Sequence, residues 1–413
     1  MFETLFTQPH VLASHNLAPC LESRKRFLLR CQEQGYPPMS IRKIAWILLI
    51  FAKSMVLCRP GPITHEEIAF AVDHRVRLTR SGRTNDSQSS RRLFIHIATA
   101  WLRFLGLLKE HHPKQKPFAR YIEHYVDFMR DQRGLSPVTI SNCRGEIINF
   151  LSTVWHPDTT LDAVTIHDID AYLAYQGNHG WARTSLHALA STLRNFFRYA
   201  EGQGWATNVS VGIEAPMVFR EEGLPLGPNW EDVQRLIASF AGDSTIDLRD
   251  RAVVLLLAVY GLRRGEVARL RLEDVDWNGE ILHVTRPKQR CTQKYPLAAS
   301  VGTAILRYLK EARPRSAHRE LFLSVEAPVR PLSPARVSGI VRSRLAMLGI
   351  DVPRRGAHCL RHANARHLLD AGFVLKEIGD HLGHRSASST RIYAKVDLTG
   401  LRRVAEIDLG SLL

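Results

Sequence analysis

The sequence has 413 residues, and its 56 Lys and Arg against 40 Asp and Glu give a formal net charge of +16. This surplus favours a polyanionic partner such as nucleic acid, although solubility alone also accounts for many basic chains. The six cysteines form no Cys-x-x-Cys pair, which argues against a zinc ribbon or disulfide framework. The longest apolar run, residues 44–51, is too short to cross a membrane, and residues 1–10 lack a basic signal-peptide start. We therefore expect a cytoplasmic, nucleoid-associated protein.

The first part of the chain, residues 1–113, has the pattern of a helical module. Thr64 followed three residues later by Glu67 is typical of a capping box at a helix start. A polar loop is expected over residues 77–90. The four predicted helices cover residues 24–34, 40–55, 64–74 and 89–108.

Residues 118–205 repeat that plan. GLSPVTISN (134–142) resembles GYPPMSIRK (35–43), and each begins a predicted helix. The other helices of this part are predicted over residues 118–132, 164–175 and 184–205. We interpret the repetition as an internal duplication, with chance similarity between amphipathic helices as the alternative.

A segment rich in proline and glycine, residues 213–228, is typical of a linker between domains. After it, a helix is predicted from Trp230, and a nearly apolar helix over residues 247–262 that should be buried. Residues 277–284, with an Asn-Gly turn, and residues 294–297 predict a small antiparallel sheet.

The polar residues between His358 and Tyr393 are hard to explain by packing. His358 and Arg361 share one face of a predicted helix, and Gly372 and Gly383 fit the ends of short helices. A tyrosine hydroxyl, with a free pKa of about 10, is a poor nucleophile without help. Arginine binds phosphate oxygens, and imidazole moves protons near neutral pH. The residues alone therefore indicate a phosphate site with a tyrosine nearby.

Two other interpretations remain open at this point. Tyr393 in isolation is more typical of a half-buried tyrosine packed in a core than of a nucleophile. The histidines of this region also suggest zinc, although the glutamate of a His-Glu-x-x-His motif is missing and no cysteine lies at ligand spacing. These histidines are His358, His362, His381 and His384.

Four motifs in order resemble those of the tyrosine recombinases, also called phage integrases. HCLRH (358–362), LGHRS (382–386) and Tyr393 resemble the C-terminal signature of that family. VYGLRRGEVARLRLEDVDW (259–277) resembles its first-arginine motif, with Arg263 as the matching residue. ILHVTRPKQRCTQKYPL (281–297) resembles its β-hairpin, and counting back from Pro296 places the catalytic lysine at Lys288. The resemblance covers roughly residues 120–410.

The hairpin departs from the family pattern. The family commonly has glycine beside the lysine, whereas Pro287 and Gln289 flank Lys288 here, which puts the geometry of the turn in doubt. Lys294 is the rival for the same role.

The resemblance implies a multidomain, mainly α-helical fold. Two helical core-binding-like (SAM-like) modules are expected, the extra one over residues 1–113 and the DNA-clamp module over residues 114–212. The linker, residues 213–228, then leads to an α+β catalytic domain with a small antiparallel sheet over residues 229–413.

The resemblance also implies site-specific DNA strand cleavage and rejoining through a 3′-phosphotyrosyl intermediate. Tyr393 is the expected nucleophile, and Arg263 and Arg361 are expected to hold the non-bridging oxygens. Lys288 is the expected general acid for the 5′-hydroxyl. His358 is expected to act in proton transfer at the tyrosine and His384 to hydrogen-bond the phosphate. No metal, cofactor or ATP is expected, and His362, His367 and Glu266 are assigned structural roles.

The implied partner is double-stranded DNA, bound by a tetramer of this chain or of this chain with sister recombinases. A C-terminal helix with Leu398, Leu401, Val404 and Ile407 on one face would dock on a neighbour or pack on its own domain. The extra module points to integration, excision or transposition of a mobile element, and its basic residues are candidates for phosphate contacts. The alternatives are an inactive DNA-binding accessory protein, a type IB topoisomerase and, least favoured, a metal-dependent hydrolase. The candidate basic residues are Arg24, Lys25, Arg26, Arg42, Lys43, Arg91 and Arg92.

Overall fold

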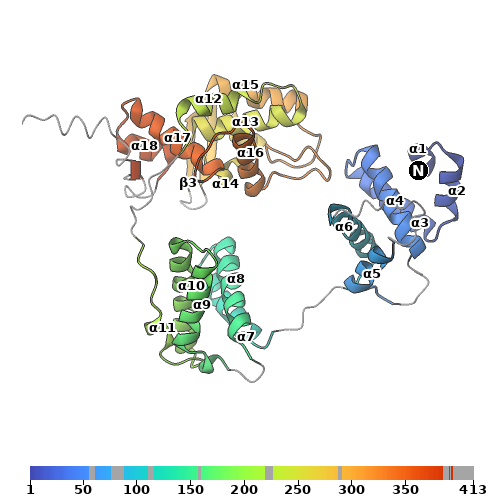
Figure 1. The fold of residues 1–413 in the computed structure, drawn as a ribbon. Helices are drawn as coiled ribbons and strands as arrows, with labels where there is room; N and C mark the ends of the chain where they lie inside the picture. Colours follow the sequence, from blue (N-terminus) through green and yellow to red (C-terminus); the bar gives the residue numbers. More distant parts are fainter. Residues whose placement is uncertain are drawn as a thin grey trace, which may run out of the picture. The chain divides into compact units, whose positions relative to one another are not determined.

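The computed structural model describes residues 1–54, 61–75, 88–109, 116–156, 160–218, 227–286, 291–384, 390 and 392–393. These residues are mainly helical, with a small antiparallel sheet in the order β1-β2-β3, which confirms the predicted fold class. The chain divides into two compact units, His111–Gly223 and Met1–Glu110 together with Leu224–Leu413. Three groups of helices follow one another along the chain (Figure 1). Each group has a hydrophobic core of its own. The boundaries expected at residues 113, 212 and 228 stay predictions.

The N-terminal helices form around the apolar faces of α4 and α6. Phe51 on α4 contacts the rings of Phe94 and Trp101 on α6, and all three side chains are fully buried. The predicted capping box is confirmed, since Thr64 and Glu67 exchange hydrogen bonds of 2.8 and 3.2 Å at the start of α5. Most of the predicted loop over residues 77–90 lies outside the described residues. The helices are α1 (Phe2–Leu5), α2 (Pro9–Leu17), α3 (Leu21–Glu33), α4 (Pro38–Ser54), α5 (His65–Arg75) and α6 (Gln88–Phe104).

The second helical group follows the predicted order. Ser136 caps α8, and Thr165 and Asp168 form a capping box at α9, so polar residues satisfy backbone donors at both helix starts. Phe150, Phe196 and Phe197 are fully buried in its core, where the ring of Phe197 contacts the other two rings. The duplication itself stays an interpretation. The helices are α7 (Ala119–Asp127), continued by a π-turn to Gln132, α8 (Pro137–Val154), α9 (Ile166–Asn178), α10 (Arg183–Gly202) and α11 (Val209–Gly212).

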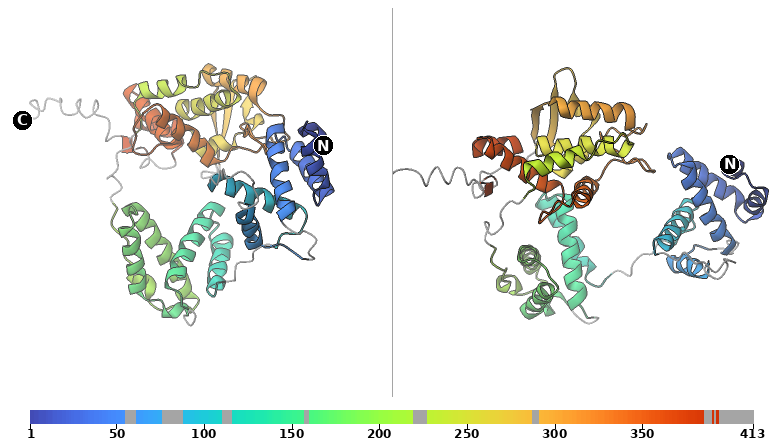
Figure 2. Two further views of the ribbon diagram at one scale, coloured as in Figure 1. Left: turned by 45° about the vertical axis from the view of Figure 1, so that its right-hand side comes forward. Right: turned by 45° about the horizontal axis from the view of Figure 1, so that its top comes forward.

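The C-terminal part of the chain is built around α13 (Thr245–Val259), which is buried along most of its length as predicted. The sheet lies beside the helices of this domain (Figure 2). In it, β2 (Ile281–Arg286) pairs antiparallel with β1 (Val275–Asp276) and β3 (Cys291–Pro296), so Leu282 lies opposite Tyr295. The other α-helices are α12 (Trp230–Ala238), α14 (Arg264–Arg269), α15 (Ala299–Arg307), α16 (Pro334–Met347), α17 (Ala357–Asp370) and α18 (Leu375–Leu382).

The chain enters this domain against α17. A side-chain carbon on Gly227 would lie 2.6 Å from the carbonyl oxygen of Cys359, so only glycine allows this approach. Three residues later, the ring of Trp230 stacks on His367, with ring centres 3.9 Å apart. This contact gives His367 the structural role expected of it. Among the described helices, none is long and apolar enough to cross a membrane.

Candidate active site

The turn after α13 positions Arg263. Gly261 has φ +58°, and a side-chain carbon there would lie 2.4 Å from Leu382, so the backbone turns tightly against α18. Arg263 then caps α14. Its Nη1 forms an ion pair of 2.8 Å with Glu266, and its Nη2 donates to the Gly383 carbonyl at 3.3 Å. The side chain is 36% exposed, so part of the guanidinium remains open to a ligand.

Arg361 on α17 is held by backbone carbonyls. Its Nη1 donates to Gly261 at 2.6 Å, and its Nη2 donates to Leu382 at 2.8 Å. Burial and the nearby Arg263 lower the pKa of Arg361 to about 10, so the group remains charged at neutral pH. With 2% of its surface exposed, Arg361 is a desolvated positive charge of the kind that binds an anion strongly.

A third arginine, Arg286 at the end of β2, reaches the same place. Its Nη1 donates to the Leu382 carbonyl at 2.6 Å and lies 3.5 Å from a carboxylate oxygen of Glu266. Glu266 therefore contacts two arginines, which confirms the expectation that it is an arginine partner. Together the three arginines bond the carbonyls of Leu382 and Gly383, where α18 ends.

Tyr393 is buried beside this cluster. Its hydroxyl lies 3.0 Å from Nδ1 of His362, and its ring packs with Ala365, Ile378 and Leu382. Burial raises the pKa of Tyr393 to about 12, although Arg361 and Arg263 act in the opposite direction. A hydroxyl with this pKa needs a proton acceptor before it can attack.

The surrounding histidines are neutral at pH 7. Burial, followed by neighbouring charged groups, lowers the pKa of His362 and of His384 to about 4, and it lowers the pKa of His358 as well. The rings of His358 and His362 meet edge to face, with centres 4.3 Å apart. His384 shares a hydrogen bond of 2.7 Å with Thr390 through Nδ1. Thr390 is the donor in the tautomer that places the proton on Nε2.

The structure thus brings together five of the six predicted site residues, while Lys288 lies outside the described residues. The five are Arg263, His358, Arg361, His384 and Tyr393. Arg286 was not predicted from the sequence. His362 was expected to be structural, whereas it is the hydrogen-bond partner of Tyr393. One feature of the sequence could have indicated Arg286: it is a charged residue at a position of β2 that should face inward. Among the described residues, no group of three His, Cys, Asp or Glu side chains is arranged to hold a metal ion.

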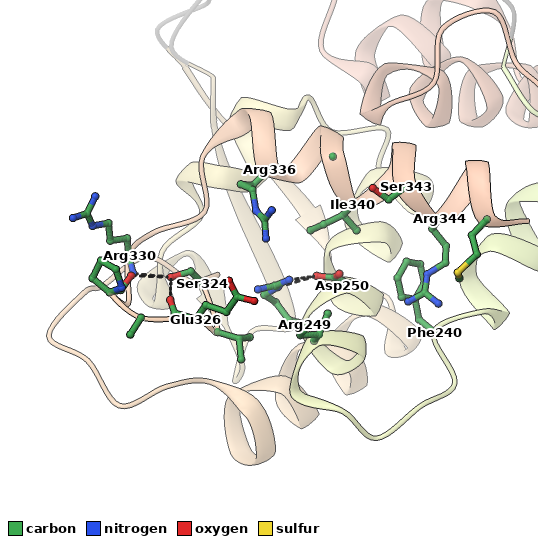
Figure 3. A pocket seen from close by; sticks show the side chains of 16 residues that line it. Phe240, Arg249, Asp250, Ser324, Glu326, Arg330, Arg336, Ile340, Ser343 and Arg344 are labelled. Carbon is green, nitrogen blue, oxygen red and sulfur yellow. Dashed lines mark hydrogen bonds and ion pairs between the residues drawn. The ribbon is translucent and has the colours of Figure 1, made fainter. Parts of the chain in front are cut away.

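A separate pocket lies between α13, α16 and the loop after Leu323 (Figure 3). Arg249 and Asp250 form an ion pair of 2.7 Å in it, and Arg344 lies over the ring of Phe240 at 4.0 Å. None of the five described site residues lines this pocket.

Residues 229–399 match the Phage integrase family, and residues 122–204 match the Phage integrase, N-terminal SAM-like domain. Neither match includes residues 1–121. A protein of Sinorhizobium fredii named as integrase/recombinase y4rA is 37% identical over 290 residues, covering 69% of this chain and 70% of the relative. Tyrosine recombinase XerC of Alcanivorax borkumensis is 29% identical over 289 residues, covering 68% of this chain and 91% of the relative.

Solved structures share the fold. The Tn1549 transposon integrase in complex with transposon right end DNA has a TM-score of 0.55 at 17% identity, covering 69% of this chain and 98% of that chain. XerH site-specific recombinase bound to difH substrate, in its post-cleavage complex, has a TM-score of 0.53 at 17% identity, covering 84% of this chain and 97% of that chain.

Proposed function

The chain belongs to the phage integrase family, and from that premise we propose that it cuts and rejoins DNA at specific sites through a 3′-phosphotyrosyl intermediate. The main support for the proposal is the environment of the Tyr393 hydroxyl. The hydroxyl of Tyr393 lies against a neutral imidazole, within the field of Arg361 and Arg263. This arrangement suits attack on an anionic phosphodiester better than it suits core packing.

In the proposed step, the Tyr393 oxygen forms a bond to phosphorus and the bond from phosphorus to the 5′-oxygen breaks. The 3′ side of the strand stays attached to the tyrosine. In the tautomer of His362 that carries its proton on Nε2, the Nδ1 atom receives the tyrosine proton directly, because it lies 3.0 Å from the hydroxyl. His358, expected from the sequence to act in this transfer, contacts the ring of His362 and acts with it. Lys288 supplies the proton for the 5′-oxygen.

Electrostatic stabilisation accounts for most of the rate in this mechanism. Arg263 and Arg361 neutralise the non-bridging oxygens, and His384 donates from Nε2. Removing one such preorganised donor commonly slows a reaction by about 10²- to 10³-fold. Because Tyr393 is 1% exposed and Arg361 is 2% exposed, DNA binding has to uncover both before the attack.

We extend the proposal to the partner and the biological role. The net charge of +16 supports binding to double-stranded DNA, and the XerH and Tn1549 proteins are DNA-bound in their structures. We propose assembly as a tetramer of this chain, or with sister recombinases, on DNA. Relatives named as integrases support a role in moving a mobile element rather than relaxing supercoils. Residues 1–113 then serve as an additional helical DNA-binding module.

Covalent trapping tests the chemistry. Wild-type protein is incubated with a nicked suicide duplex made from the ends of the element that encodes it, and the products are separated on a denaturing gel. We expect a protease-sensitive shifted band that is lost in Tyr393→Phe. The matched control is Tyr308→Phe, which removes the hydroxyl of another buried tyrosine of the same domain. A band that persists in Tyr393→Phe overturns the assignment of the nucleophile.

A further inference from the structure

Arg286 occupies a position that strand geometry reserves for apolar residues. Alternate residues of β2 point inward, and the first two of these, Leu282 and Val284, are fully buried. Arg286 is the third and is 1% exposed. Placing a charged group there costs several kcal/mol unless it is paired and hydrogen-bonded. Packing alone therefore does not explain the choice of residue.

The contacts of Arg286 are directed at the active site. Its Nη1 shares the Leu382 carbonyl with Nη2 of Arg361, at 2.6 and 2.8 Å respectively. Its Nη2 donates to the hydroxyl of Tyr295, which in turn donates to the His381 carbonyl. Arg286 thus connects β2 and β3 to the last turn of α18. That turn is followed by Gly383 and then by His384.

Gly383 is shaped around this side chain. A side-chain carbon at Gly383 would lie 2.3 Å from Cζ of Arg286, so the guanidinium fills the space that any other residue would need. Arg286 can also act through charge. Arg263, Arg286 and Arg361 with Glu266 are three positive groups and one negative group, which leaves a surplus of two positive charges. Such a surplus complements the charge that develops on a phosphate under attack.

We propose that Arg286 is a positioning residue of the phosphate site. It fixes the Leu382–Gly383 peptide, and through it the guanidinium of Arg361 and the ring of His384, without touching the DNA itself. The inference rests on the proposed strand-cleavage function. It predicts that loss of Arg286 slows the chemical step more than it weakens DNA binding or folding.

The test compares Arg286→Met and Arg286→Lys with wild type, using single-turnover cleavage of the suicide duplex at saturating protein. DNA affinity and thermal stability are measured in parallel. The matched control is Arg249→Met, because Arg249 is also a buried arginine in an ion pair but lines the separate pocket (Figure 3). This control shows what the loss of a buried arginine does away from the site.

We expect Arg286→Met to lower the saturating cleavage rate by about 10- to 100-fold, the scale of a small misplacement of reacting groups. Its DNA affinity should change by less than about threefold, because the side chain does not reach the surface. Arg286→Lys should lie between Arg286→Met and wild type, because lysine keeps the charge but cannot make the forked contact. The melting temperature of Arg249→Met should fall by about as much as that of Arg286→Met, while its cleavage rate should stay close to that of the wild type.

Three outcomes overturn the proposal: a rate loss in Arg286→Met no larger than in Arg249→Met, a defect confined to DNA affinity, or a wild-type rate in Arg286→Lys. The lysine variant decides the matter if Arg286→Met does not fold. A wild-type protein that forms no covalent complex instead contradicts the proposed function, so the two failures are distinguishable.

Discussion

Replacing Glu266 by glutamine removes the negative charge that two arginines share. The Glu266 side chain is 4% exposed, and one of its oxygens lies 2.8 Å from Nη1 of Arg263 and 3.5 Å from Nη1 of Arg286. Breaking a buried ion pair typically costs about 3–5 kcal/mol, because the remaining charge is buried without compensation. Glutamine still accepts hydrogen bonds, so we expect a loss near the lower end, about 3 kcal/mol. For a domain of this size, that loss lowers the melting temperature by roughly 6–12 °C.

The measurement should follow the catalytic domain separately from the other cores. Urea unfolding monitored by hydrogen exchange in peptides from α13 meets this need. Glu273→Gln is the matched control, because Glu273 also contacts two arginines, Arg271 at 2.9 Å and Arg319 at 3.2 Å, but is 44% exposed. A surface pair of this kind contributes at most about 1 kcal/mol. Equal losses in the two variants, or a loss below about 1 kcal/mol in Glu266→Gln, would refute the reasoning.

Further predictions concern pH and glycine. The pKa of His362 and of His384 is about 4 in the folded chain against an ordinary 6.5, so the unfolded chain binds more protons in this range. The free energy of unfolding should therefore fall as the pH is lowered from 7 to 5, by about 1 kcal/mol for each histidine after solvent screening. Urea unfolding at the two pH values measures this fall, which should be smaller in His362→Asn. Gly383→Ala should destabilise by more than about 2 kcal/mol through its left-handed backbone and the clash with Arg286. Gly349→Ala is the control, because Gly349 also has a left-handed backbone, with φ +67°, but has open space around it. It should lose about 1 kcal/mol of stability. Equal losses of stability in the two variants, measured by thermal unfolding, would contradict the proposed clash.

Local patterns predicted most of the architecture. The capping box at Thr64, the turn at Asn278 and Gly279 and the helix end at Gly383 each depend on a few neighbouring residues, and all three are present. The family was likewise predicted from short motifs in order. Lys288 and the C-terminal helix lie outside the described residues, so both stay predictions, as do the assigned roles.

The features that were missed depend on contacts between distant segments. Arg286 bonds a carbonyl 96 residues further along the chain, and no local pattern around residue 286 indicates that partner. His362 lies next to Arg361, but a helix turns about 100° per residue, so the two side chains leave it in different directions. Only the packing of Tyr393 against α17 shows which histidine meets the hydroxyl.

The way the chain joins α17 bears on how the catalytic domain is isolated for study. The family match begins at residue 229, which makes that residue a natural place to start a shortened protein. Such a fragment would keep the stacking of Trp230 on His367 but lose Gly227, which fits against the carbonyl of Cys359 between His358 and Arg361. A fragment that starts a few residues earlier keeps this backbone support. Cleavage rates measured on the shorter fragment would therefore come from a protein in which α17 has lost its contact with Gly227.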